Sequence, residues 1–117
     1  MNIVQETEDG VLVLRLSGQL MGGSEAEAVR EAIQEALKKG IHRILVDIEG
    51  VTWVNSTGLG VLIASHMAAR QKGGALKLIR PSRRIESILN VTRLSTVFEV
   101  HRTEEEARRS FAAAPTG

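Results

Sequence analysis

The strongest constraint on the fold is an apolar segment that leads, through a short turn, into the start of a helix. The expected strand over 42–48 contains the apolar run Ile44, Leu45 and Val46 followed by Ile48, which is typical of a strand buried on both faces of a sheet. An apolar helical pattern then runs from Thr57 to the glycine pair Gly73 and Gly74. Buried strands that alternate with helices through short connections are parallel. We therefore expect an α/β domain.

The rest of the chain continues this alternation. Asp9 and Gly10 predict a β-hairpin, and a loop is expected over 18–23. The expected strands cover 3–7, 11–16, 42–48, 75–79 and 97–100. Helices are expected to begin at Ser24, Thr57, Pro81 and Thr103. The order predicts one small domain over 1–111, with a mixed, mostly parallel sheet that a hairpin opens and about four helices. A disordered tail is expected at 112–117.

Two of these helix starts show the spacing of a capping box, in which a hydroxyl and an acid three residues later bond each other's backbone N–H groups. The pairs are Ser24 with Glu27 and Thr103 with Glu106. Both are expected to satisfy N–H groups that would otherwise lack partners.

Composition excludes several classes of function. The 117 residues are 43% apolar and 25% charged with a net charge of +1, so neither nucleic acid nor a membrane surface is expected as the main partner. The chain has no cysteine, which excludes disulfides and fits a reducing cytoplasm. No apolar stretch is long enough for a membrane span, and no secretory signal is visible. A cytoplasmic protein is expected.

Motifs for catalysis and cofactors are absent from the sequence. The histidines His42, His66 and His101 lack metal-ligand spacing, and no phosphate-binding loop of the P-loop type occurs. Ser56 does not lie in a Gly-x-Ser-x-Gly motif and has no evident base. We therefore expect no catalytic residue, metal or cofactor.

The stretch from Asp47 to Gly60 carries the functional signal. Ser56 is expected at a helix N-terminus, where unpaired N–H groups and the helix dipole favour an anion. Gly58 and Gly60 would each cost a helix about 1 kcal/mol relative to alanine, which suggests a close approach to the backbone. The pattern predicts a phosphorylatable serine on an accessible helix end. The alternative is that Ser56 only caps the helix.

This stretch resembles the signature of the STAS domain family, the anti-sigma factor antagonists of bacteria. The matching positions are Asp47, Ile48, Val51, Val54, Ser56, Thr57, Gly58, Leu59 and Gly60. The likeness extends from about Ile3 to Phe111. It implies that Ser56 is phosphorylated by a partner that is both anti-sigma factor and serine kinase, and reset by a metal-dependent serine phosphatase. Asn55 stands where the family usually has Asp, which keeps the capping chemistry and removes a negative charge.

The resemblance implies an anti-sigma factor antagonist that binds its partner when unphosphorylated, releases a sigma factor and catalyses nothing. The chain is expected to be a monomer or weak dimer. The expected partner-binding residues are Asp47, Asn55, Ser56, Thr57, Gly58, Leu59, Gly60 and Ile63. One alternative, which Asn55 favours, is an unphosphorylated scaffold or accessory subunit of a stress-signalling or lipid-transport complex. Another is nucleotide binding at the Ser56 helix end.

Three neighbouring features allow two interpretations each. Asp47 either caps the turn that follows it or contacts the partner. Trp53, the only tryptophan, is expected to pack on the domain's own core rather than to anchor a partner. Arg80, Arg83 and Arg84 form a basic stretch at a helix start, either simply solvated or binding an acidic partner or phosphate. Cations there oppose the helix dipole, which favours a binding role.

Overall fold

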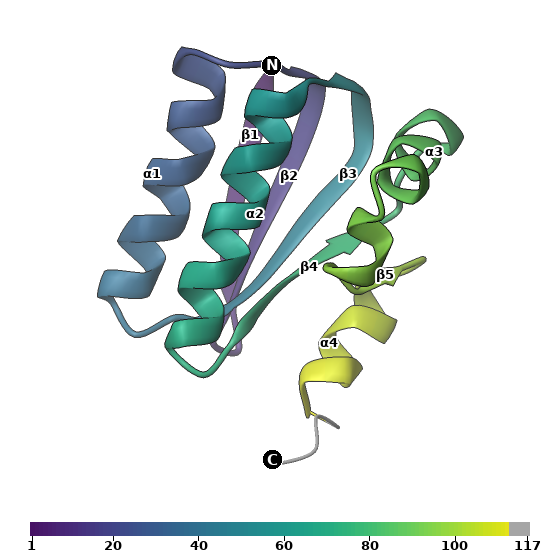
Figure 1. Ribbon diagram of the computed structural model, residues 1–117. Helices are drawn as coiled ribbons and strands as arrows, with labels where there is room; N and C mark the ends of the chain where they lie inside the picture. The colour runs from purple at the N-terminus through teal and green to yellow at the C-terminus, as the bar shows by residue number, and fades with distance from the viewer. Residues whose placement is uncertain (113–117) are drawn as a thin grey trace.

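A five-stranded sheet in the order β1-β2-β3-β4-β5 runs through the molecule (Figure 1). The computed structural model describes residues 1–112. Its strands are β1 (Asn2–Glu8), β2 (Val11–Leu20), β3 (Arg43–Val54), β4 (Ala75–Ile79) and β5 (Val100–His101). Its helices are α1 (Ser24–Lys38), α2 (Ser56–Gln71), α3 (Arg83–Val91) and α4 (Glu104–Ala112), with a short 3-10 helix η1 (Leu94–Thr96). Strand β1 is antiparallel to β2 and the other pairs are parallel. The predicted α/β fold, with a mixed sheet and four helices, is confirmed.

The hairpin forms at the dipeptide that predicted it. Asp9 and Gly10 have φ values of 53° and 75°, and Glu8 pairs with Val11 across the turn. Positive φ at both central residues gives the turn the twist of the flanking strands, and Asp-Gly accepts this conformation at low cost. The hairpin therefore fixes the register of β1 against β2.

The two faces of the sheet are covered differently. Along β2, Leu12 and Leu14 point to one face and Val11 and Val13 to the other, as the period of two requires. Helices α1 and α2 lie side by side across the first face (Figure 1), and α3 adds Ile85 and Leu89 to the same core. Helix α4 covers the second face. The smaller cluster there comprises Val11, Val13, Leu45, Ile79, Ala107 and Phe111.

Strands β2 and β3 extend several residues further than the sequence predicts. Strand β2 continues to Leu20, where a loop over 18–23 is expected, and β3 continues to Val54 instead of ending at Ile48. The register between β2 and β3 shifts twice, and each shift adds one residue to β3. Val51 and Val54 are consequently both buried although three residues apart. Because this spacing breaks the period of two, the sequence indicates a turn.

One of the two predicted capping boxes is absent from the structure, and half of the other is present. Helix α1 has Gly23 as its N-cap without a side-chain cap bond, and Ser24 is already helical, so the box at Ser24 is wrong. At α4 the Thr103 hydroxyl accepts a hydrogen bond from the Glu106 N–H at 3.1 Å, as predicted. The structure gives only this half of the reciprocal pair.

The end of the chain also differs from expectation in detail. Strand β5 begins at Val100 rather than Val97, because η1 ends only at Thr96 and Phe98 is buried in the core before the strand begins. The predicted tail began at Ala112, which is instead the last residue of α4. Residues 113–117 lie outside the described part of the chain.

Candidate functional site

Helix α2 begins with a cap that frees Ser56. The Asn55 Oδ1 accepts a hydrogen bond from the Gly58 N–H at 2.9 Å, and Asn55 has the extended backbone of an N-cap. Ser56 is the first helical residue, so the interpretation of Ser56 as the cap is wrong, as is the assignment of Thr57 as the first helical residue. Across residues 1–112 the exposed Ser56 side chain makes no hydrogen bond.

The environment of Ser56 favours a negative group. The Gly58 and Leu59 N–H groups already bond to Asn55, which leaves those of Ser56 and Thr57 at the helix end. No acidic residue lies in the first turn of α2. A phosphate on Ser56 would therefore face the positive end of the helix dipole without an adjacent carboxylate.

Gly58 and Gly60 differ in the space that an added side chain would find. A Cβ on Gly58 would lie 2.3 Å from the Leu20 carbonyl oxygen, because α2 crosses β2 closely at this point. A Cβ on Gly60 would meet nothing within 4 Å. Gly58 is buried and faces its own sheet, so the expectation that it contacts a partner is corrected. Gly60 leaves a bare, exposed patch of helix.

The remaining predicted residues of this region lie together at the start of α2, and we call them the Ser56 surface. Its members lie at the cap or on the first two turns of α2 and are exposed or half-buried: Asn55, Ser56, Thr57, Leu59, Gly60 and Ile63. Leu59 and Ile63 pack partly against the core. Thr57 is flanked by Gly22 of the β2–α1 loop, whose Cβ would lie 3.2 Å from the threonine methyl. The surface is thus mildly apolar with a hydroxyl at its edge.

Asp47 lies apart from this surface, on the face that α4 covers. Its side chain is buried, and Oδ2 accepts hydrogen bonds from Arg15 at 3.2 Å and from Arg80 at 2.5 Å. Oδ1 accepts one from the Glu49 N–H at 3.0 Å, which is the capping role that the sequence allows. Burial alone would raise the pKa of Asp47, but the bonds from Arg80 and Glu49 outweigh it and hold the pKa below its ordinary value. The carboxylate is therefore engaged within the chain.

The contacts of Asp47 belong to a charged network that reaches α4. Arg15 also donates to Glu6 at 2.7 Å and to Glu104 at 2.8 Å, and these bonds raise its pKa. Glu104 accepts a further bond from Arg108 at 2.9 Å. Burial opposes the ionised form of Glu104, yet the two arginines lower its pKa overall. We call Glu6, Arg15, Asp47, Arg80 and Glu104 the sheet–α4 network.

Trp53 is exposed, not buried as the sequence suggested. Because Val51 and Val54 are the inward residues of this part of β3, Trp53 turns outward with 40% of its surface exposed. The guanidinium carbon of Arg84 lies 5.9 Å from the centre of its ring. The spacing of the two valines is the sequence signal that could have identified Trp53 as a surface residue.

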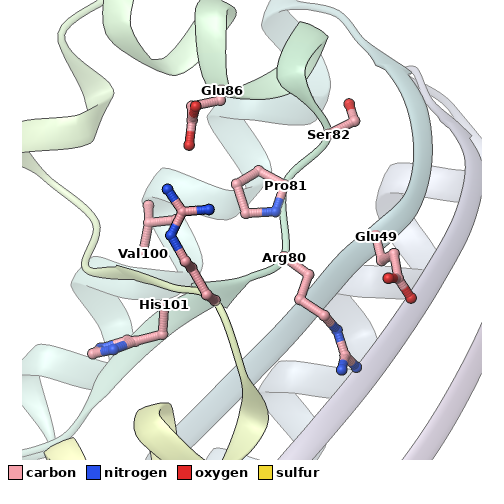
Figure 2. Close-up of a pocket in the computed structure, with 8 residues that line it drawn as sticks. Glu49, Arg80, Pro81, Ser82, Glu86, Val100 and His101 are labelled. Atoms are coloured by element: carbon pink, nitrogen blue, oxygen red, sulfur yellow. The ribbon is translucent and has the colours of Figure 1, made fainter.

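A cleft that the sequence did not predict lies where β4 and β5 end and α3 begins (Figure 2). Its volume is about 650 Å³, and its lining residues are Glu49, Arg80, Pro81, Ser82, Glu86, Val100, His101 and Arg102. Figure 2 shows the Arg80 side chain turned away from Glu86, and its guanidinium bonds Asp47. With both carboxylates and basic groups in its lining, the cleft favours neither sign of ligand charge.

Within residues 1–112 no helix combines the length and apolar character that a membrane crossing needs. The same residues contain no group of three or more His, Cys, Asp or Glu side chains that could hold a metal ion.

The chain is similar to known proteins over nearly its whole length. A model of the STAS domain matches residues 2–107. The anti-sigma F factor antagonist of Paenibacillus polymyxa is 26% identical over 108 residues, which are 92% of each chain. The crystal structure of an anti-sigma factor antagonist from Mycobacterium paratuberculosis superposes with a TM-score of 0.82 at 22% identity, over 95% of this chain and 93% of that one.

The Bacillus cell fate determinant SpoIIAA, in its phosphorylated form, superposes with a TM-score of 0.74 at 24% identity. The match covers 92% of this chain and 97% of SpoIIAA. At these identities the two solved structures show a shared fold.

Proposed function

Because the chain belongs to the STAS domain family, we propose that it is an anti-sigma factor antagonist whose binding surface is switched by phosphorylation of Ser56. One observation carries the proposal. The Ser56 hydroxyl is exposed at the first turn of α2, while Asn55 performs the capping that would otherwise explain a serine there. The hydroxyl is thus left free for modification.

The proposed partner is an anti-sigma factor with serine kinase activity and a histidine-kinase-like ATPase fold. The Paenibacillus polymyxa relative is named for its action against an anti-sigma factor, which supports this class of partner. The unphosphorylated chain binds the partner through the Ser56 surface and so releases a sigma factor. A metal-dependent serine phosphatase restores the unphosphorylated form. The chain acts by binding rather than by catalysis, and it works in the cytoplasm with its partner.

A phosphate would alter binding far more than folding. It adds about −1.5 to −2 charges at pH 7 and three acceptor oxygens at an exposed position. Within the chain these face the free N–H groups of Ser56 and Thr57, so the fold is retained. At the partner interface the same charge must be desolvated against Leu59 and Ile63. The complex therefore dissociates.

The phosphoacceptor is tested by incubating the chain with the histidine-kinase-like anti-sigma factors encoded in the same genome, together with ATP and magnesium. Peptide mass spectrometry is expected to place one phosphate on Ser56. Ser56→Ala should abolish it and Thr57→Ala, which removes the neighbouring exposed hydroxyl, should keep it. Phosphate that remains in Ser56→Ala would contradict the assignment.

Binding is tested by calorimetry with the kinase identified in this way. Ser56→Asp should weaken binding at least about tenfold, whereas Ser95→Asp adds the same charge at an exposed serine of η1 and should leave binding unchanged. Neither variant should lower the melting temperature appreciably. Equal affinities for wild type and Ser56→Asp would instead favour the unphosphorylated scaffold.

A further inference from the structure

The Ser56 surface has an exposed aromatic neighbour on β3. Trp53 precedes Ser56 by three residues, so their Cα atoms are at most about 11 Å apart. Trp53 has 40% of its surface exposed, although a large aromatic ring gains free energy when it is buried. The guanidinium carbon of Arg84 lies over the ring, 5.9 Å from its centre. The other exposed atoms of Trp53 are open to a ligand.

The arginine above this ring has a charge that its own chain does not neutralise. Arg84 and its neighbour Arg83 lie in the first turn of α3 and are exposed. Over residues 1–112 neither side chain forms an ion pair or a hydrogen bond, in contrast to Arg15 and Arg80. Two cations at a helix N-terminus oppose the helix dipole. Helix stability therefore gives no reason for their presence.

We propose that Trp53 and Arg84 form a docking anchor for an acidic segment of the partner that binds the Ser56 surface, an inference that rests on the function proposed above. Arginine binds a carboxylate through two parallel hydrogen bonds, and contact with the ring holds its planar group in place for this purpose. Tryptophan and arginine are also the residues that most often dominate the binding free energy of protein interfaces. The anchor adds charge complementarity to an otherwise mildly apolar surface.

The anchor also explains why a phosphate on Ser56 would release the partner. The phosphate would sit on a residue whose Cα lies at most about 11 Å from that of Trp53, on the order of the distance over which salt screens exposed charges. Its negative charge repels the carboxylates of a partner segment seated on Arg84. It also attracts the Arg84 guanidinium, which is held by no other ion pair in the described residues. Both effects weaken the complex without a change of fold.

The anchor is tested with the kinase partner identified by the phosphorylation assay. Arg84→Gln should weaken binding about tenfold or more, because it removes the charge over the ring. Arg83→Gln is the matched control, since it removes the same charge from the next exposed residue, and it should weaken binding less than about threefold. Trp53→Leu should also weaken binding about tenfold. The affinity loss caused by Arg84→Gln should shrink as salt is raised.

The outcomes separate this inference from the proposed function. If wild type binds and Ser56→Asp releases the partner, but Arg84→Gln binds as Arg83→Gln does, the anchor is wrong and the proposed function stands. If no kinase of this class binds, the proposed function fails and the anchor with it. Saturable binding of a single-stranded oligonucleotide that depends on Arg84, without partner binding that depends on it, would also overturn an acidic protein as the occupant.

A second measurement tests the geometry without any partner. Trp53 is the only tryptophan, so its fluorescence reports this position alone. A cation over the ring attracts the anionic quencher iodide more than the neutral quencher acrylamide. The ratio of the iodide to the acrylamide quenching constant should fall in Arg84→Gln and stay at the wild-type value in Arg83→Gln. An equal ratio in all three proteins would show that Arg84 does not lie at the ring in solution.

Discussion

The two faces of the sheet are held to their helices by different means. On the first face, α1, α2 and α3 pack through a large cluster of aliphatic side chains. On the second face, the described side chains of α4 add Ala107 and Phe111 to a small apolar cluster, and Glu104 and Arg108 add charged contacts. Apolar burial depends little on pH or salt, whereas ion pairs depend on both. The first face should therefore contribute most of the free energy of unfolding, and the second should determine how that free energy changes with pH and salt.

The same comparison of the two faces separates the Ser56 surface from the residues that attach α4 to the sheet. The Ser56 surface lies at the beginning of α2, on the first face, which we call the apolar face. Its backbone is held by the contact of Gly58 with Leu20. Asp47 belongs to the same signature stretch but lies on the second face, which we call the charged face. One short stretch of sequence thus supplies both the proposed site and the attachment of α4.

The largest effect is expected from added bulk on the apolar face. Gly58→Ala places a methyl group against the Leu20 carbonyl, which cannot move without shifting β2, so we expect a loss of about 3 kcal/mol or more. Gly60→Ala is the control on the same helix. It meets no atom within 4 Å and should stabilise the free domain by up to about 1 kcal/mol. Urea unfolding of both variants gives the free energies. Similar values for the two would contradict the close crossing of α2 over β2.

Gly60→Ala also tests the Ser56 surface when it is combined with binding. If a partner approaches the bare patch at Gly60, the added methyl should impair the complex while the free domain gains stability. Unchanged affinity would place the partner elsewhere on α2.

A smaller loss is expected from breaking the charged face at its centre. Asp47→Asn keeps the size of the side chain but leaves Arg15 and Arg80 without their shared anion. Because both arginines remain partly exposed to water, we expect a loss of about 2 kcal/mol rather than the larger cost of a fully buried pair. Glu27→Gln, which breaks an exposed pair with Arg30, should be indistinguishable from wild type. A loss in Glu27→Gln as large as that in Asp47→Asn would show that burial of the network is unimportant.

Acid should weaken the charged face selectively. The pKa values of Asp47 and Glu104 are lower in the folded chain than their ordinary values of 3.8 and 4.5. The unfolded chain therefore binds protons at these two carboxylates first as the pH falls, so the stability that they contribute is fully present above about pH 5 and is lost progressively below it. We expect a loss on the order of 1 kcal/mol between pH 6 and pH 4. Glu104→Gln should reduce this loss, as measured by urea unfolding at each pH, and an unchanged loss would exclude Glu104 as a contributor.

The smallest predicted effect comes from His66, a titratable group that is buried on the first, apolar face. Burial lowers the pKa of His66 below its ordinary value of 6.5, with a further contribution from Arg70, and its Nδ1 accepts a hydrogen bond from the Leu76 N–H at 3.1 Å. The unfolded chain takes up this proton more readily, so stability should fall by about 0.5 kcal/mol as the pH drops from 7 to 5. His66→Asn keeps an acceptor near Nδ1 and removes the titration. The pH 7 to 5 decline should disappear in this variant, and its persistence would assign it to another group.

The sequence predicts elements well where local signals define both ends. Strand β4 was placed correctly at 75–79, because Gly73 and Gly74 precede it and Pro81 follows it. Ser82 caps α3 by accepting a hydrogen bond from the Ile85 N–H, as its position before an apolar helical pattern suggests. The position of Ser56 at the start of α2 follows from the same kind of signal.

The errors arise where the direction or the contacts of a residue depend on a segment that is distant in the sequence. The outward direction of Trp53 depends on register shifts between β2 and β3, and the local spacing of Val51 and Val54 fits such shifts as well as it fits a turn. Asp47 is engaged by Arg15 and Arg80, which lie 32 and 33 residues away. The requirement for glycine at Gly58 comes from Leu20 on another strand. Local chemistry therefore located the candidate site, and only the tertiary structure separated its exposed residues from those that support it.

The unequal lengths of the strands have a consequence for local motion. Pairing between β3 and β4 ends at Asp47 and Ile79, so within residues 1–112 the stretch 48–54 has a strand neighbour only in β2 (Figure 1). Amide protons in such a two-stranded ribbon exchange with solvent through local opening rather than through global unfolding. Deuterium should therefore enter 48–54 sooner than 44–47. The ribbon that carries Trp53 and leads to Asn55 can then adjust to a bound protein while the rest of the sheet stays closed.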